Sequence, residues 1–139
     1  MLHAVAMGLY LLDCLLLLVF AVIYLLRGKA MPYHLEAMGC SWDDVPLGTQ
    51  LVVVALMRAA GSAYLALTVA MGVLTVLGLG QGVPWANGAL LASGLALLLP
   101  LTAVVVQVRV RTGARSPIVS CASGLVLLGV AFCCELHAS

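Results

Sequence analysis

Long runs of apolar residues alternate with short polar stretches along the chain, and four of these runs are long enough to cross a membrane. A bilayer core requires about 20 helical residues, and each run reaches that length. Inside lipid only helices and closed barrels satisfy the backbone, and these runs are too long and continuous for barrel strands. We therefore predict that residues 1–139 form a single all-α domain, a transmembrane four-helix bundle with spans at about 2–26, 47–79, 85–107 and 116–134.

The first apolar run carries one carboxylate, Asp13, within the segment LYLLDCLLLLVF at residues 9–20. An aspartate at the centre of a membrane helix costs roughly 2.5–3.5 kcal/mol on insertion scales, whereas each leucine favours insertion by about 0.3–0.6 kcal/mol. Nine leucines between positions 9 and 26 outweigh that cost. The helix is therefore expected to insert with Asp13 inside the membrane.

Most of the polar and aromatic residues of the first run lie on one helical face. Steps of three and four residues connect them, which keeps a stripe on one side of a helix in a left-handed bundle. This stripe consists of His3, Ala6, Tyr10, Asp13, Leu17, Phe20 and Tyr24. The second run repeats the spacing at Arg58, Gly61, Leu65, Thr68, Gly72 and Thr75. We predict a polar seam inside the bundle that includes Tyr10, Asp13, Arg58 and Thr68.

The last two runs have comparable patterns. Small residues recur at every fourth position of the third run, at Gly88, Ala92 and Ala96, and such a ridge permits close helix approach. The fourth run offers a stripe at Ser116, Ser120, Ser123, Leu127, Val130, Cys134 and His137. Together the four patterns favour a compact bundle with aliphatic residues facing outward.

The composition agrees with a membrane location. Hydrophobic residues make up 65% of the chain and charged residues 8%, whereas a soluble domain is about half apolar and about a quarter charged. A net charge of +1 gives no electrostatic reason for a nucleic-acid partner. Most of the basic residues flank the first and third connections, and the positive-inside rule then predicts cytoplasmic connections and external termini. These residues are Arg27, Lys29, Arg109, Arg111 and Arg115.

Charged side chains in a membrane usually face protein and pair with one another. Asp13 and Arg58 are poorly placed for a direct pair, because they lie roughly 20 Å and roughly 11 Å from the cytoplasmic ends of their helices. Their side chains also lean in opposite directions, each toward its own helix N-terminus. We expect Arg58 to extend to the interface. Asp13 is then either neutral and bonded to a hydroxyl or a carbonyl, or in contact with another subunit.

The main polar segment, residues 27–48, contains most of the acidic residues. A metal site would need several histidine and carboxylate groups to converge, and neither this segment nor the set His3, Glu135 and His137 has spacing that enforces convergence. We therefore predict no metal ligands, leave cofactors open, and favour a solvated cytoplasmic loop. The loop residues with functional potential are Tyr33, His34, Glu36 and Trp42.

A Met-Pro-Tyr-His sequence precedes a Gly and a Trp, and a Gln and a Leu-Met-Arg sequence follow. These positions are Met31, Pro32, Tyr33, His34, Gly39, Trp42, Gln50, Leu56, Met57 and Arg58. In this pattern residues 31–67 resemble the first loop and second helix of a family of small bacterial four-helix membrane proteins. The resemblance implies the four-span topology, a bacterial cytoplasmic membrane, and a loop that packs against the second helix. The family has no assigned activity, so the resemblance implies none.

Three hypotheses for the function follow. The chain has no GxSxG, HExxH, phosphate-loop or dinucleotide motif, and we predict no catalytic residue. The first hypothesis is an accessory subunit that packs against other integral membrane subunits, or against itself, with membrane lipids around it. The alternative is an oligomeric channel or carrier for a small ion or solute that uses Asp13. An interfacial enzyme using His34, Glu36 and Asp43 is the third.

Overall fold

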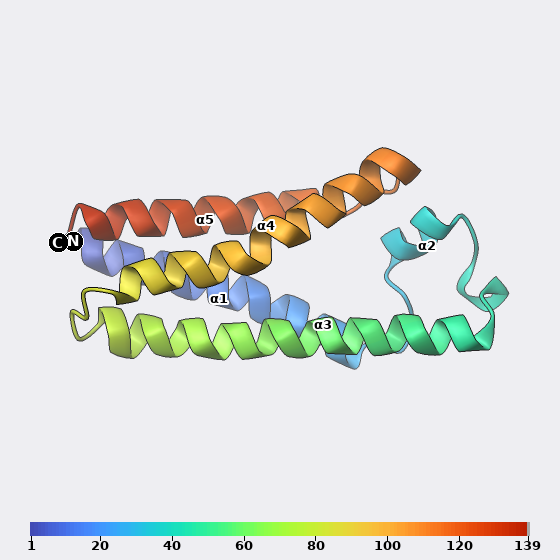
Figure 1. The fold of residues 1–139 in the computed structure, drawn as a ribbon, viewed down its shortest axis with the longest axis horizontal. Helices are drawn as coiled ribbons and strands as arrows, with labels where there is room; N and C mark the ends of the chain where they lie inside the picture. The colour runs from blue at the N-terminus through green and yellow to red at the C-terminus, as the bar shows by residue number, and fades with distance from the viewer. Residues whose placement is uncertain (139) are drawn as a thin grey trace.

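A computed structural model of the chain describes residues 1–138 and confirms the all-α prediction. Four helical segments in this range are long and apolar enough to cross a membrane, which agrees with a membrane location (Figure 1). They are α1 (Leu2–Leu26), α3 (Leu47–Val73) with its continuation η2 (Leu74–Leu79), α4 (Ala86–Thr112) and α5 (Ile118–Leu136). These bounds match the predicted spans closely.

Helix α1 lies between two neighbours, because α3 packs along one side of it and α5 along another. Helix α4 packs against α5 and against η2. The first turn of α1 and the last turn of α5 lie together at one end of the bundle, which we call the termini end (Figure 1). Two shorter helices lie at the other end, which we call the α2 end. All seven residues of the predicted α1 stripe are buried or half-buried, so the unusual face of α1 points into the protein.

Helix α4 changes direction near its middle, and Figure 1 shows its second half inclining away from α3. Pro100 lies inside this helix. A proline lacks the backbone N–H of a helical hydrogen bond, and its ring clashes with the preceding turn, so an interior proline bends a helix. The bend gives the α2 end room for the polar segment that connects α1 to α3.

The polar segment is ordered into a short helix, α2 (Pro32–Met38), and a 3-10 turn, η1 (Trp42–Asp44). Pro32 begins α2, where its missing N–H costs nothing, and Gly39 ends it with a φ of 67°. Trp42 is buried against the first turns of α3, and the Gln50 amide nitrogen donates to two carbonyls of the segment, those of Trp42 and Val45, at 2.9 Å each. The segment therefore packs against the start of α3.

Helix α4 extends to Thr112, five residues beyond the predicted end at position 107. The prediction stopped where the apolar run meets the first arginines. Arg109 and Arg111 instead lie in the last turn of the helix, where positive charge interacts favourably with the helix dipole. Gly113, with a φ of 74°, then ends the helix.

Candidate functional site

Asp13 is the most unusual residue of the bundle. Its side chain is 0% exposed near the middle of α1, and within residues 1–138 neither carboxyl oxygen has a hydrogen-bond partner. Gly124 of α5 faces it so closely that a Cβ there would lie 3.2 Å from the Asp13 Oδ1 atom. The Leu98 side chain of α4 lies against Gly124 as well, 3.3 Å from the same Cβ position. An ionised carboxylate in such surroundings is very costly, so the carboxyl group is expected in its neutral, protonated form.

A buried hydrogen-bonded pair, Tyr10 and Asn87, lies one helical turn from Asp13, toward the termini end. The Tyr10 hydroxyl donates to the Asn87 Oδ1 atom of α4 at 2.7 Å. The Asn87 amide nitrogen donates in turn to the Phe132 carbonyl of α5 at 3.4 Å. Tyr10 and Asp13 are three residues apart and share the buried face of α1. The pair therefore links three helices directly beside the Asp13 site.

The termini end carries a hydrogen-bonded pair of side chains, His3 and Glu135. The His3 Nδ1 atom lies 2.9 Å from both Glu135 carboxylate oxygens, and the side chains are 43% and 11% exposed. A cavity of about 530 Å³ is lined by His3 and Glu135 and also by Asn87. It therefore connects the His3–Glu135 pair to the Tyr10–Asn87 pair. We call the whole series the polar column; its members are His3, Glu135, Asn87, Tyr10 and Asp13.

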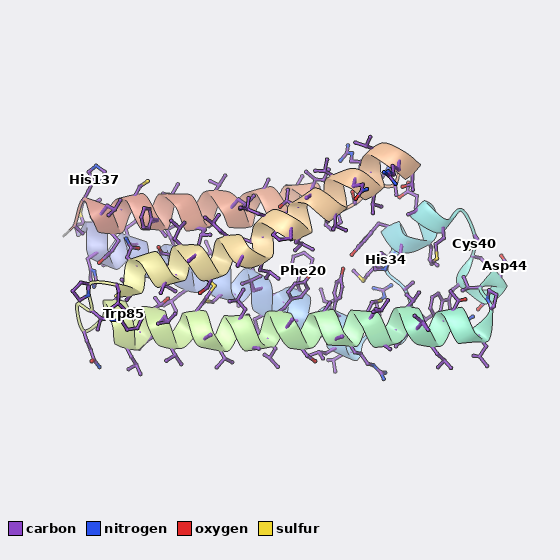
Figure 2. All side chains as sticks on the ribbon, in the orientation of Figure 1. Phe20, His34, Cys40, Asp44, Trp85 and His137 are labelled. Carbon is purple, nitrogen blue, oxygen red and sulfur yellow. The ribbon has the colours of Figure 1, made fainter. Side chains whose placement is uncertain are left out.

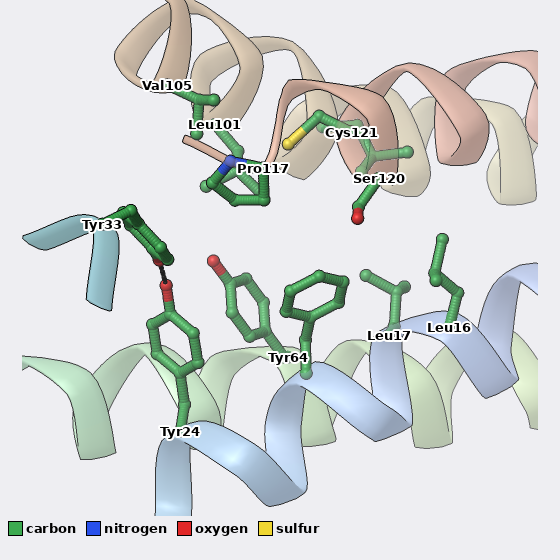
Figure 3. A pocket seen from close by; sticks show the side chains of 12 residues that line it. Leu16, Leu17, Tyr24, Tyr33, Tyr64, Leu101, Val105, Pro117, Ser120 and Cys121 are labelled. Carbon is green, nitrogen blue, oxygen red and sulfur yellow. Dashed lines mark hydrogen bonds between the residues drawn. The ribbon is translucent and has the colours of Figure 1, made fainter. Parts of the chain in front are cut away.

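On the other side of Asp13 the interior is mainly apolar. A cavity of about 40 Å³, lined by Leu17, Phe20 and Leu98 among others, leads toward the α2 end (Figure 3). Its polar groups are tyrosine hydroxyls, Ser120 and Cys121. The hydroxyls of Tyr24 and Tyr33 are hydrogen-bonded, and Tyr64 packs edge-on against Tyr24 with ring centres 5.7 Å apart. The cavity exceeds the roughly 10–15 Å³ that one water molecule requires.

The stripe predicted on α3 is only partly buried, and the assignment of Arg58 to a polar seam inside the bundle is wrong. Arg58 is exposed and Thr68 is half-buried, with its hydroxyl donating to the Tyr64 carbonyl at 2.9 Å. Burying the larger Met57 and Tyr64 removes more apolar surface and leaves the Arg58 charge outside the protein interior. Asp13 and Arg58 are therefore not a pair. The buried face of α3 and η2 comprises Met57, Gly61, Tyr64, Met71, Thr75 and Leu79.

The patterns predicted for α4 and α5 also face other directions. Ser123 and Val130 are exposed, because the buried face of α5 is one residue further along, at Cys121, Gly124, Leu128, Ala131 and Glu135. The Ser123 hydroxyl bonds the carbonyl one turn earlier at 2.8 Å, so it needs no partner in the interior. The α4 ridge of Gly88, Ala92 and Ala96 faces outward.

The four loop residues do not converge on one site. Tyr33 bonds Tyr24, Trp42 is buried against α3, and the Glu36 Oε2 atom accepts a hydrogen bond from the Arg115 backbone N–H at 2.9 Å. The His34 ring lies edge-on to Tyr33 with ring centres 4.3 Å apart. Among residues 1–138 no three His, Cys, Asp or Glu side chains gather as a metal site would require. His137 bonds the Cys133 carbonyl and not a carboxylate.

Sequence reasoning missed Asn87 as a member of the site and grouped Glu135 with both terminal histidines, of which only His3 contacts it in the described residues. Asn87 lies two residues after Trp85, at the predicted start of the third span. An amide inside an apolar helix is nevertheless a signal that this face of the helix contacts protein. Glu135 is near His137 in sequence, whereas its partner, His3, is 132 positions away. Spacing along one helix gives no information about such a pair.

Removing the Tyr10 hydroxyl tests whether the Tyr10–Asn87 bond stabilises the bundle. Tyr10→Phe leaves a buried amide oxygen without its donor, and we expect the free energy of unfolding in detergent to fall by about 1–3 kcal/mol. In an Asn87→Leu background the same change should cost much less, because no acceptor remains. Equal losses in both backgrounds would contradict a direct interaction.

The resemblance of residues 31–67 to small bacterial membrane proteins stays a prediction. The geometry described above is therefore the basis for a functional assignment. No protein family, no curated protein and no solved structure matches this chain.

Proposed function

We propose that the protein is a small proton channel or proton-linked carrier in which Asp13 binds the transported proton inside the membrane. The observation that carries this proposal is the fully buried carboxyl group without a hydrogen-bond partner in residues 1–138. A structural carboxyl group at this depth is normally paired or hydrogen-bonded, because an unpaired one destabilises the fold. Ionisable residues inside membranes commonly mark the route of an ion.

The polar column gives this site access from the termini end. The cavity of about 530 Å³ is large enough to hold water beside His3, Glu135 and Asn87. The Tyr10 hydroxyl, bonded to Asn87, is the last polar group before Asp13. Imidazole, carboxyl and hydroxyl groups can each accept one proton and release another, whereas the Asn87 amide orients the Tyr10 hydroxyl without relaying a proton itself. Neither Asp13 oxygen is hydrogen-bonded to Tyr10, so the final transfer to Asp13 requires a water molecule between them or a movement of the Tyr10 side chain.

The apolar section beyond Asp13 favours a gated proton pathway and argues against an open pore. Leu17 and Leu98 line the small cavity together with three tyrosines of the α2 end, whereas Asp13 is not part of its lining. A proton leaving in that direction needs either water in the small cavity or a rearrangement of these side chains. The resting protein would thus hold its proton at Asp13 and keep the two membrane faces separated.

The distribution of basic residues indicates which end of the bundle faces the cytoplasm. Arg27, Lys29 and Arg115 lie in the connections at the α2 end, next to the arginines in the last turn of α4. By the positive-inside rule this end faces the cytoplasm, so the polar column opens outward. In a bacterial cytoplasmic membrane, as the resemblance implies, the proton gradient would drive uptake from the outside.

Proton flux in liposomes tests the proposal. Purified protein is reconstituted into vesicles containing a pH-sensitive dye, and a potassium gradient with valinomycin supplies the driving voltage. We expect the lumen to change pH faster than in protein-free vesicles made in parallel, with a rate that rises with protein content. A rate equal to that of the empty vesicles at both signs of the voltage would overturn the proposal.

An accessory-subunit function is supported by a different observation. The ridge of Gly88, Ala92 and Ala96 faces outward along α4, and outward-facing small residues allow a second membrane helix to pack closely. The partner would be another integral membrane subunit or a second copy of this chain. Such an association is compatible with proton transport through each copy.

Blocking the ridge tests the association. Ala92→Leu places a large side chain where a neighbouring helix would lie, and we expect the intact-particle mass in mild detergent to fall to that of one chain. Val104→Leu, which enlarges another exposed residue of α4, serves as the control and should leave the mass unchanged. A wild-type protein that is already a single chain in native membranes would exclude this function.

A further inference from the structure

Helix α2 has a fixed base and a loosely held body. The base is fixed because Ala30, before the helix, and Trp42, after it, belong to one buried cluster that packs against Val53 of α3. Between these two points the helix is only half-buried, and within the described structure none of its residues is fully buried. From its base α2 extends toward the second half of α4, which it contacts (Figure 1). The body of α2 can therefore move while its base stays in place.

Two side-chain hydrogen bonds hold the body of α2 against the bundle. The Tyr33 hydroxyl is bonded to the Tyr24 hydroxyl of α1. The Glu36 Oε2 atom accepts from the Arg115 backbone N–H at 2.9 Å, and Arg115 lies in the connection between α4 and α5. The bond from Arg115 is exposed, so water can replace it when it breaks. We call these two bonds the latch.

Helix α2 lies where two spaces in the protein adjoin. The inner cavity, of about 40 Å³, is lined by Tyr33 and Cys121 among others (Figure 3). A larger groove, of about 430 Å³, is lined by His34 and Ala37 among others. The Tyr24 side chain lines both spaces, and it is also the partner of Tyr33 in the latch. A displacement of α2 would therefore take Tyr33 out of the wall of the inner cavity and open that cavity toward the groove.

The observed position of α2 leaves one polar atom unsatisfied. The His34 Nδ1 atom is buried and has no hydrogen-bond partner within residues 1–138. Figure 2 labels His34 in the region between α2 and α3. A buried polar atom without a partner opposes the arrangement that buries it, and contact with water would satisfy the nitrogen. The latch thus favours the observed position of α2, whereas His34 favours its displacement.

We propose that α2 is a hinged lid over the inner cavity, closed by the latch and able to admit water from the α2 end when the latch breaks. Gly39 provides the hinge, because its φ of 67° lies in the region that glycine adopts most readily. The lid is a property of α2 and its contacts. Its use as the exit of the proton route is a further step that rests on the proposed function.

The reaction of Cys121 with N-ethylmaleimide tests whether the lid opens. Cys121 and Cys14 are 5% and 6% exposed, but of the two only Cys121 lines the inner cavity. Cys40 is exposed just beyond α2 (Figure 2). In the full chain in detergent, the labelling of each cysteine is followed by mass spectrometry of its peptides. We expect Cys40 to react fastest, Cys121 more slowly and Cys14 slowest, because the reagent reaches Cys121 when the lid opens.

Breaking the latch should accelerate the labelling of Cys121 selectively. Tyr33→Phe and Glu36→Ala each remove one latch bond, and we expect each to raise the Cys121 rate by roughly threefold to tenfold. The Cys14 rate should stay at its wild-type value, because that residue lies away from the lid. An unchanged Cys121 rate in both variants, or an equal rise at Cys14, would overturn the inference.

Two further variants serve as controls. Asp43→Ala removes an exposed carboxylate of the same polar segment outside α2, and the Cys121 rate should not change. Asp13→Asn removes the proposed proton site and should keep the wild-type labelling pattern. The labelling does not measure proton flux, so a failure of the lid and a failure of the proposed function are distinguishable.

Discussion

Asp13→Asn should reduce voltage-driven proton flux in proteoliposomes to the level of protein-free vesicles. Asparagine has nearly the same size and shape as a protonated aspartic acid, so it fits beside Gly124 and Leu98 without a new clash. It cannot release or bind a proton at physiological pH. In the proposed mechanism the flux requires a titratable group at this depth, and no other acidic side chain of the polar column lies beyond Tyr10.

The control for this variant is another polar residue within a span. The Thr68 hydroxyl already bonds the Tyr64 carbonyl, so Thr68→Val should leave the flux unchanged. Both variants should unfold at the same detergent concentration as the wild type within the error of the measurement. If Asp13→Asn folds normally and conducts like the wild type, Asp13 has no part in the mechanism.

Gly61→Val should lower the free energy of unfolding by about 3 kcal/mol, the upper part of the usual range for overpacking. A Cβ atom at Gly61 would lie 3.0 Å from the Leu25 backbone nitrogen, the Leu25 Cγ and the Tyr24 Cβ. The contact with backbone cannot be relieved by a side-chain rotation, so α1 and α3 would have to move apart. The measurement is reversible unfolding in mixed micelles, followed by circular dichroism.

Gly72 provides a matched position for comparison. It lies on the same helix, and a Cβ there meets nothing within 4 Å among the described residues. Gly72→Ala should be neutral or stabilising by up to about 1 kcal/mol, because alanine is the better helix former. Gly61→Ala should be destabilising under the same conditions. Equal effects at the two positions would mean that the close approach of α1 and α3 does not limit stability.

The sequence was sufficient for the four spans, apart from the last five residues of α4, and for the buried face of α1. Apolar length and the turn signals around each run determine where a membrane helix begins and ends, and these are local properties. The α1 stripe was recognisable because Tyr10 and Asp13 cannot satisfy their polar atoms within their own helix. Such residues must face protein, so their spacing reports the buried face.

The faces of α3 and α5 were not predictable by the same reasoning. Ser and Thr hydroxyls bond the carbonyl one turn earlier, as at Thr68 and Ser123, and are therefore tolerated on any side of a membrane helix. Their spacing carries little information about burial. The faces depend instead on how Tyr64 and Met57 pack against other helices. Pro32 and Gly39 indicate the start and the end of α2, but they lie within the segment that we predicted to be a solvated loop.

The candidate site was only partly visible in the sequence for a related reason. Asp13 and Tyr10 were identified from α1 alone. Their partners in the polar column come from α4 and α5, and the Tyr10–Asn87 bond joins residues 77 positions apart. Periodicity describes one helix at a time, whereas the column depends on the rotation of each helix relative to the others.

Infrared spectroscopy of the reconstituted protein tests most directly whether Asp13 carries a proton inside the membrane. A protonated carboxylic acid has a carbonyl stretch that ionised carboxylates lack, and the band shifts when the proton exchanges for deuterium. At neutral pH we expect the wild type to show this band, D2O to shift it, and Asp13→Asn to remove it. A wild-type spectrum without the band, or a band that persists unchanged in Asp13→Asn, would contradict the account.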